Sequence, residues 1–213
     1  MTAILVCGGT LSAAFLRVFV AEHKAAAVFA VDGGLAVLEE AGIVPDYLVG
    51  DFDTASEALV SRYENRCVTI RHKPEKDATD TELAVEEALS RGATELFLLG
   101  ATGSRMDHTM ANIHMLYYVL QRGKQAWIVN ENNRISLHAA SFERKKEELF
   151  GAYVSFLPFF GEVKEVTLTG FKYPLCKKTM TAGNSLGISN EVIEENIGVT
   201  FSDGYLLMIE ARD

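Results

Sequence analysis

Residues 3–9 read Ala-Ile-Leu-Val-Cys-Gly-Gly, an apolar run that ends in two glycines. The continuous apolar run predicts a buried β-strand over Ala3–Cys7, and the Gly8-Gly9 pair ends it. The residues that follow, Leu11–Glu22, have the spacing of a helix. A buried strand, a glycine turn and a helix together indicate the first unit of an α/β fold.

The same alternation continues to about residue 130. Further strands are predicted over Ala27–Val31, Tyr47–Val49, Cys67–Ile70, Leu96–Leu99 and Ala126–Val129. Helices are predicted between them, over Leu35–Ala41, Ala55–Glu64, Thr81–Ser90 and Met110–Leu120. Strands that alternate with helices favour a mostly parallel sheet flanked by helices. We therefore predict an α/β domain over residues 1–131.

The pattern changes after Arg134, where helical spacing gives way to short β-rich runs separated by glycines. These runs are Ile135–Ala139, Tyr153–Leu157, Val163–Thr169, Val199–Phe201 and Tyr205–Glu210. We predict an all-β sandwich over residues 134–213. The polar residues Glu131-Asn132-Asn133 suit a linker between the two domains.

Composition excludes several classes of protein. Of the 213 residues, 48% are hydrophobic and 23% are charged, which argues against disorder. The net charge of −9 argues against a nucleic-acid binder, and the basic run Arg144–Lys146 is followed by acidic residues, as on a solvated face. No segment is apolar for long enough to span a membrane. The three separated cysteines, Cys7, Cys67 and Cys176, favour reduced thiols in a cytoplasmic protein.

Aspartates occur at the ends of three of the predicted strands. Asp51 and Asp53 come directly after Tyr47–Val49, and if the strand continues through them, both carboxylates project to one side. Carboxylate oxygens are the ligands that Mg²⁺ takes in proteins. The alternative is that this Asp-Phe-Asp segment is only a turn, because Asp often begins turns.

A second acidic pair, Asp77 and Asp80, precedes the predicted helix Thr81–Ser90. Thr79 and Glu82 fit a capping box, which explains those two residues without any site. Capping does not require both aspartates, however, and a helix N-terminus also offers free N–H groups to a phosphate. The segment is therefore either a helix cap or part of a site.

The third segment, Gly100–His108, joins a strand to a helix through glycines. A glycine turn lets backbone approach a phosphate, and Arg105 supplies a planar cation that fits phosphate oxygens. The alternative for Asp107 is that it caps the helix that follows, and His108 is either a proton carrier or a surface residue. The Cys7–Thr10 turn is a weaker glycine signal of the same kind. No Walker A motif occurs in the chain.

Ligands of open α/β sheets bind outside the carboxyl ends of the strands, where these three segments are expected to meet. Clustered carboxylates repel each other unless a cation neutralises them. Aspartates, an arginine and glycine turns around one crevice therefore point to Mg²⁺-assisted phosphoryl or diphosphoryl transfer.

The chain resembles the thiamine pyrophosphokinase family in a set of segments that occur in the family's order over almost the whole chain. In the N-terminal part these are Asp32-Gly33-Gly34, Gly50–Asp53, Lys76–Asp80 and Gly103–His108. In the C-terminal part they are Thr169–Leu175 and Ser185–Glu191.

The resemblance implies transfer of the diphosphate of ATP to thiamine in a homodimer whose active sites lie between subunits. It implies that Mg²⁺ and the reacting groups are held by Asp51, Asp53, Asp77 and Asp80. ATP would contact Asp32, Gly33, Thr54, Gly103 and Arg105. Thiamine would contact Asp107, Tyr173, Ser189 and Asn190, although a tyrosine such as Tyr173 is, as a bare sequence feature, more often a packing residue.

The implied reaction is attack of the thiamine hydroxyl on the β-phosphorus of ATP, with AMP as the leaving group. Either Asp80 or Asp53 could accept the proton of the hydroxyl. Two alternatives remain open at this point. One is a kinase that acts on another small alcohol, and the other is a non-catalytic protein that senses thiamine.

Overall fold

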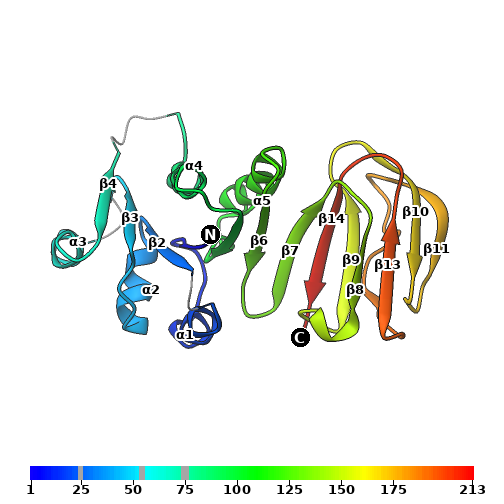
Figure 1. Ribbon diagram of the computed structural model, residues 1–213, viewed down its shortest axis with the longest axis horizontal. Helices are drawn as coiled ribbons and strands as arrows, with labels where there is room; N and C mark the ends of the chain where they lie inside the picture. The colour runs from blue at the N-terminus through cyan, green and yellow to red at the C-terminus, as the bar shows by residue number, and fades with distance from the viewer. Residues whose placement is uncertain (24–25, 53–55, 73–76) are drawn as a thin grey trace. The chain divides into compact units, whose positions relative to one another are not determined.

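The chain folds into two compact units, which divide between Glu131 and Asn132 (Figure 1). The structure, a computed structural model, describes residues 1–23, 26–52, 56–72 and 77–213. In these four ranges, no helix is both long and apolar enough to cross a membrane.

The N-terminal unit is built on a parallel sheet. Its strands are β1 (Thr2–Val6), β2 (Ala27–Val31), β3 (Tyr47–Gly50), β4 (Val68–Arg71), β5 (Glu95–Leu99) and β6 (Gln125–Val129). Their order is β6-β5-β1-β2-β3-β4, and each neighbouring pair is parallel. The predicted strands are confirmed to within one residue at either end.

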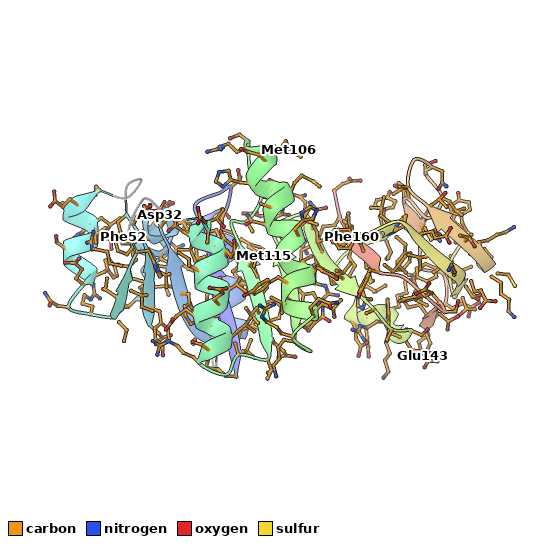
Figure 2. The ribbon with its side chains drawn as sticks, turned by 90° about the horizontal axis from the view of Figure 1, so that it is seen from above. Asp32, Phe52, Met106, Met115, Glu143 and Phe160 are labelled. Carbon is orange, nitrogen blue, oxygen red and sulfur yellow. The ribbon has the colours of Figure 1, made fainter. Side chains whose placement is uncertain are left out.

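Helices cover both faces of this sheet. They are α1 (Ala13–Glu22), α2 (Gly34–Ala41), α3 (Glu57–Tyr63), α4 (Asp80–Ser90) and α5 (Met106–Leu120). α4 and α5 lie on one face, and α1 and α2 lie on the other (Figures 1 and 2). Because both faces are covered, β1 can be apolar throughout, and Ile4, Leu5 and Val6 have no exposed surface. The predicted α/β domain is therefore confirmed.

The predicted start of the last helix is wrong. We expected a helix from Met110, but α5 begins at Met106. Met106 is exposed at the first turn, and Met115 is buried further along the helix (Figure 2). The apolar spacing used for the prediction starts only where the helix begins to pack, and its first turn projects beyond the core. Arg105 is consequently the N-cap, and Asp107 lies within the helix.

The C-terminal unit is antiparallel. One group of strands has the order β12 (Asn190–Glu191), β9 (Tyr153–Pro158), β14 (Leu206–Ala211) and β7 (Asn133–His138). The other is a four-stranded sheet in the order β11 (Leu175–Thr181), β10 (Glu162–Thr169), β13 (Asn196–Thr200) and β8 (Phe142–Lys145). A short 3₁₀ helix, η1, covers Lys146–Glu148. The predicted β-rich C-terminal part is confirmed.

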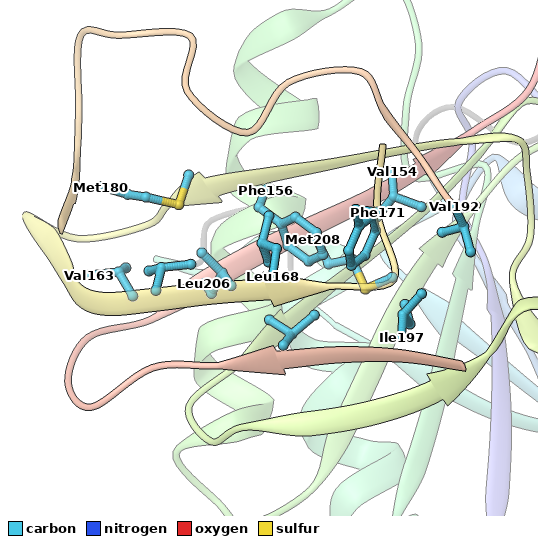
Figure 3. Close-up of a cluster of buried hydrophobic side chains, with 12 residues drawn as sticks. Val154, Phe156, Val163, Leu168, Phe171, Met180, Val192, Ile197, Leu206 and Met208 are labelled. Carbon is cyan, nitrogen blue, oxygen red and sulfur yellow. The ribbon is translucent and has the colours of Figure 1, made fainter. Parts of the chain in front are cut away.

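Both groups of strands contribute to one core (Figure 3). Phe156 of β9 and Leu206 of β14 pack with Leu168 of β10, and all three are fully buried. The same cluster includes Met180, the one buried residue of β11. A common core means that the two groups of strands face each other.

Strands β8 and β11 were not predicted. They are the two edges of the four-stranded sheet, and their sequences, Phe-Glu-Arg-Lys and Leu-Cys-Lys-Lys-Thr-Met-Thr, are largely charged or polar. Charged side chains, lysine above all, protect sheet edges from pairing with other chains. They also hide the apolar alternation by which a strand is recognised in a sequence.

Candidate functional site

A pocket of about 430 Å³ opens at the carboxyl ends of β1, β2 and β5 in the N-terminal unit. The chain builds the sheet outward from β1 through β2 to β4, and then returns to the other side of β1 with β5. Open α/β sheets bind ligands at such a reversal of strand order. The pocket is lined by Cys7, Gly8, Gly9, Val31, Asp32, Gly33, Thr79, Asp80, Thr81, Gly100, Ala101, Thr102, Gly103, Ser104, Arg105, His108, Thr109 and Asn112.

Two glycine turns, which follow β1 and β5, interlock at the floor of this pocket. Gly9 N donates to Gly100 O at 2.8 Å, and Thr10 N donates to Thr102 O at 2.7 Å. A Cβ atom on Gly9 would lie 2.4 Å from both of these carbonyl oxygens, so no side chain fits there. Gly100 has φ +62°, a conformation that glycine adopts without strain. The weak glycine signal at Cys7–Thr10 therefore marks a real part of the pocket.

A third turn, after β2, carries two of the predicted residues, Asp32 and Gly33, into the lining. Asp32 follows the last residue of β2, adopts φ +43°, and donates its N–H to Val49 O at 2.9 Å. Gly34, two residues after Asp32, approaches β1 so closely that a Cβ atom on Gly34 would lie 1.8 Å from Val6 O. Close approach to β1 is therefore what requires glycine at position 34.

Helix α4 places Asp80 at the pocket. Thr79 is the N-cap, and its Oγ1 accepts from Glu82 N at 3.2 Å, which confirms the predicted threonine cap. Asp80, the first residue of the helix, lines the pocket. The next residue, Thr81, donates from Oγ1 to Cys7 Sγ at 3.7 Å and joins α4 to the end of β1.

Cys7 lies on the pocket floor as a protonated thiol. Burial raises its pKa to about 11, and the hydrogen bond from Thr81 only partly opposes this shift. A thiol with such a pKa is a poor nucleophile at neutral pH. Cys7 is thus an inert thiol of the core.

Arg105 and Asp107 form an ion pair at the mouth of the pocket. Arg105 Nη2 lies 2.6 Å from Asp107 Oδ2, and Arg105 Nε donates to Asp107 Oδ1 at 3.2 Å. Hydrogen bonds from Arg105 and from His108 N lower the pKa of Asp107 to about 2. Arg105 lines the pocket together with Gly103, whereas Asp107 does not. Both side chains are well exposed, so a phosphate can replace the carboxylate at little cost.

The third strand does not continue through Asp51, which was the condition for both carboxylates to project to one side. β3 ends at Gly50, and Phe52 has φ +63° with its side chain only 8% exposed (Figure 2 labels Asp32 and Phe52). Phe52 turns into the core and breaks the two-residue repeat that would align Asp51 with Asp53. Asp53 and Thr54 lie outside the described residues.

Asp80 is the predicted metal ligand that the structure places at the pocket. Of the other described candidates, neither Asp51 nor Asp77 is part of the lining, and Asp77 is exposed. Among the residues of the four described ranges, no three acidic, histidine or cysteine side chains gather closely enough to hold a metal ion.

A second pocket, of about 410 Å³, lies within the C-terminal unit. It is lined by Tyr173, Leu175, Asn184, Ser185, Leu186, Gly187, Ile188 and Asn190. The Tyr173 side chain is 59% exposed, whereas Asn190 is buried and holds both backbone groups of Tyr173. Asn190 Oδ1 accepts from Tyr173 N at 3.0 Å, and Asn190 Nδ2 donates to Tyr173 O at 2.8 Å. The amide of Asn190 therefore positions Tyr173.

Ser189, the remaining predicted residue, is beside this pocket in sequence but is not part of the lining. It adopts φ +52°, and its N–H donates to Ser155 Oγ at 3.0 Å. The structure thus brings Tyr173 and Asn190 together and uses the backbone of Ser189 to anchor the loop to β9.

Sequence reasoning missed several lining residues of the first pocket, among them Thr81, Thr102, Thr109 and Asn112. A signal was present for the two on α5. Positions 105, 108, 109 and 112 follow the spacing of one helix face. It went unused because the helix was expected to begin at Met110, after three of these four positions.

Comparison with known proteins agrees with this division of the chain. The family model described as "Thiamin pyrophosphokinase, catalytic domain" matches residues 21–128. The model described as "Thiamin pyrophosphokinase, vitamin B1 binding domain" matches residues 141–206. The first pocket lies in the unit that carries the first match, and the second pocket in the unit that carries the second.

Whole-chain relatives give the same result. Thiamine pyrophosphokinase of Bacillus subtilis is 36% identical over 86% of this chain and 86% of its own length. A crystal structure of the thiamine pyrophosphokinase of that organism superposes with a TM-score of 0.88 at 32% identity and covers the whole of both chains. That of Geobacillus thermodenitrificans has a TM-score of 0.87 at 33% identity and covers 100% of this chain and 98% of its own. The chain therefore belongs to the thiamine pyrophosphokinase family.

Proposed function

We propose that this protein transfers the diphosphate group of ATP to the hydroxyl of thiamine, with thiamine diphosphate and AMP as products. The observation that carries the proposal is the first pocket, in which two glycine turns, Arg105 and Asp80 surround a crevice at the point where strand order reverses. Exposed backbone and an arginine fork suit phosphates. The relatives' printed names supply the acceptor, thiamine.

Mg²⁺ is part of the proposal. The donor chemistry fits, because Asp80 brings a carboxylate to the pocket, and Mg²⁺ binds through one or two carboxylates together with substrate phosphates and water. We propose Asp51, Asp53, Asp77 and Asp80 as its ligands. Bound there, the ion would neutralise negative charge on the phosphates.

The remaining roles fall to Asp53, Thr54 and residues of the first pocket. Arg105 leaves its pairing with Asp107 and binds a phosphate of ATP, beside the backbone of Gly103. Asp32 and Gly33 contact the nucleotide, as does Thr54. Asp80 or Asp53 accepts the proton of the thiamine hydroxyl as its oxygen attacks the β-phosphorus.

The C-terminal unit is proposed to be a β-sandwich that binds thiamine. Its common core supports the sandwich, and its pocket offers an exposed aromatic ring, Tyr173, to a flat heterocycle. Asn190 holds the backbone of Tyr173, so the ring is positioned before the ligand arrives. Ser189 and Asp107 are the other proposed thiamine contacts.

We also propose a cytoplasmic homodimer with active sites between subunits, formed by residues 1–131 of one subunit and residues 134–213 of its partner. The free cysteines Cys7, Cys67 and Cys176 are consistent with a reducing compartment. A mixture of two impaired variants, Asp80→Asn and Tyr173→Ala, assayed at a thiamine concentration well below KM, tests the shared site. Heterodimers would regain one intact site, so mixed and re-equilibrated subunits should recover activity. If the mixture is no more active than the average of the two variants measured alone, the site is not shared.

Product analysis tests the reaction itself. The protein is incubated with thiamine, ATP and Mg²⁺, with and without a chelator, and the nucleotide product is identified. AMP together with thiamine diphosphate, lost on chelation, supports the proposal. ADP would instead indicate a kinase that transfers one phosphoryl group. Thiamine binding without turnover would indicate a sensor.

A further inference from the structure

Asn112 is a buried polar residue whose position needs an explanation. Its side chain is only 7% exposed, and it lines the first pocket from α5. A buried amide normally has both its N–H and its C=O ends hydrogen-bonded, because an unpaired polar group in a core is costly. The two ends of the Asn112 amide have different surroundings.

The N–H end holds the glycine turn after β5. Asn112 Nδ2 donates to Ala101 O at 2.7 Å. A peptide carbonyl oxygen can only accept a hydrogen bond, so this contact determines which end of the amide faces the turn. Oδ1 therefore points away from Ala101 O.

The C=O end is available to a ligand. Among the residues that the structure describes, none donates a hydrogen bond to Asn112 Oδ1. Oδ1 is also not among the fully enclosed polar atoms without a hydrogen-bond partner, so part of its surface is accessible. Because Asn112 lines the pocket, this acceptor is reachable from the pocket.

We propose that Asn112 determines nucleotide specificity: its Oδ1 accepts a hydrogen bond from the nucleoside half of the bound nucleotide. The inference rests on the proposed function and extends it to one subsite. Phosphate oxygens are acceptors, so they cannot pair with Oδ1, and Arg105 and Asp80 suit the phosphate end. The nucleoside carries the matching donors, namely the ribose hydroxyls and the amino group of adenine.

The hydrogen bond from Asn112 Nδ2 to Ala101 O gives the contact with the nucleoside a further consequence. The turn that it holds at Ala101 is also tied to the first glycine turn, through Gly9 N and Gly100 O. One side chain therefore connects the nucleoside to the backbone that is proposed to bind the phosphates. Asn112 sets the position of the nucleotide along the pocket as well as contacting it.

Asn130 provides a matched control. Its Nδ2 donates to Thr102 Oγ1 at 3.0 Å, so it supports the same turn, but it is not part of the pocket lining. If Asn112 only held the turn, replacing either asparagine would weaken the binding of all nucleotides to a similar degree. If Asn112 also contacts the nucleoside, its replacement alone abolishes discrimination between AMP and an analogue that lacks the donor.

The test measures binding to the full chain by calorimetry, with AMP, 2′-deoxy-AMP, 3′-deoxy-AMP and purine riboside monophosphate, which lacks the amino group. We expect the wild-type protein to bind one analogue about five- to tenfold more weakly than AMP, the effect of one neutral hydrogen bond. Asn112→Ala should bind AMP and that analogue equally, whereas Asn130→Ala should keep the difference. Asn112→Leu, which fills more of the volume, replaces Asn112→Ala if that variant is unstable.

The inference is overturned if the wild-type protein binds all four nucleotides equally, or if an Asn112 variant still binds AMP more tightly than the analogue. It is also overturned if the Asn112 variants lose affinity for thiamine and keep their preference for AMP. The measurement needs no turnover. A failure here is therefore separate from a failure of the proposed reaction, which product analysis detects in the wild-type protein.

Discussion

The two pockets of this protein differ in what forms their walls. The first has a wall of backbone, where glycine turns such as Gly9 and Gly100 lie too close to neighbouring carbonyls for any side chain. The second is walled by side chains, with Tyr173 59% exposed and Leu186 38% exposed. Backbone walls tolerate no added atom, whereas side-chain walls tolerate exchange for similar residues. Phosphate binding suits the former, and recognition of a flat organic ring suits the latter.

The largest expected effect comes from adding one carbon to the backbone wall. Gly9→Ala places a Cβ atom 2.4 Å from Gly100 O and Thr102 O, so the two turns must separate. We expect a loss of about 3 kcal/mol in the free energy of unfolding, measured by denaturant unfolding. The control is Gly103→Ala in the turn after β5, where the nearest atom, Thr10 N, is 3.4 Å away. Equal stability of the two variants would contradict the close-approach argument.

Asp80→Asn tests the charge at the first pocket without altering its shape. We expect kcat to fall about 100-fold or more, because the transferring phosphates lose a carboxylate that orients their counter-ion. Thermal stability should stay near that of the wild-type protein. Asp203→Asn, an exposed aspartate of the C-terminal unit, should retain full activity. Near-normal turnover of Asp80→Asn would remove Asp80 from the mechanism.

The C-terminal unit should be the more acid-sensitive of the two. Burial, with a smaller contribution from Arg144, lowers the pKa of His138 to about 4. The unfolded chain, with a histidine pKa of about 6.5, then binds more protons than the folded one between pH 6.5 and 4. Stability should therefore fall across this window as the pH decreases, by at most about 3 kcal/mol.

His138→Gln should flatten that dependence. The measurement is denaturant unfolding at pH 7.5 and pH 4.5, followed by a probe in each unit. The single tryptophan, Trp127, reports on the N-terminal unit. If the variant and the wild-type protein lose stability equally on acidification, His138 is not the responsible group.

The smallest expected effect lies in the side-chain wall. Tyr173→Ala should raise KM for thiamine about tenfold, the usual contribution of an aromatic contact, and should leave KM for ATP unchanged. Tyr173→Trp should restore tight thiamine binding, since an aromatic ring is all that stacking requires. Steady-state kinetics with each substrate varied in turn checks both variants. An equal rise in both KM values would mean that Tyr173 supports the fold and does not bind thiamine selectively.

Local pattern was enough to predict the α/β unit. Its strands are covered on both faces, so runs such as Ala3–Cys7 are apolar throughout and visible without structural context. Edge strands β8 and β11 were missed for the opposite reason, because few of their residues face a core. The glycine turns were visible for a local reason as well: at Gly100, a left-handed backbone and a close approach both require glycine.

What the sequence by itself determined is the order of strands, helices and glycine turns, and the types of residue that follow the strands. Only the tertiary structure decided which of these residues share a pocket. Strand order, which depends on long-range packing, brings Asp32, Asp80 and Arg105 to the reversal point beside β1. The left-handed turn at Phe52 sets Asp51 apart from that lining, and the early start of α5 adds Thr109 to it. The turn at Phe52 could not be read from local spacing, because the burial of a side chain is determined by the contacts that surround it. The helix face did leave a signal in the spacing of positions 105, 108, 109 and 112, but the start of the helix, which depends on those contacts too, was needed to recognise it.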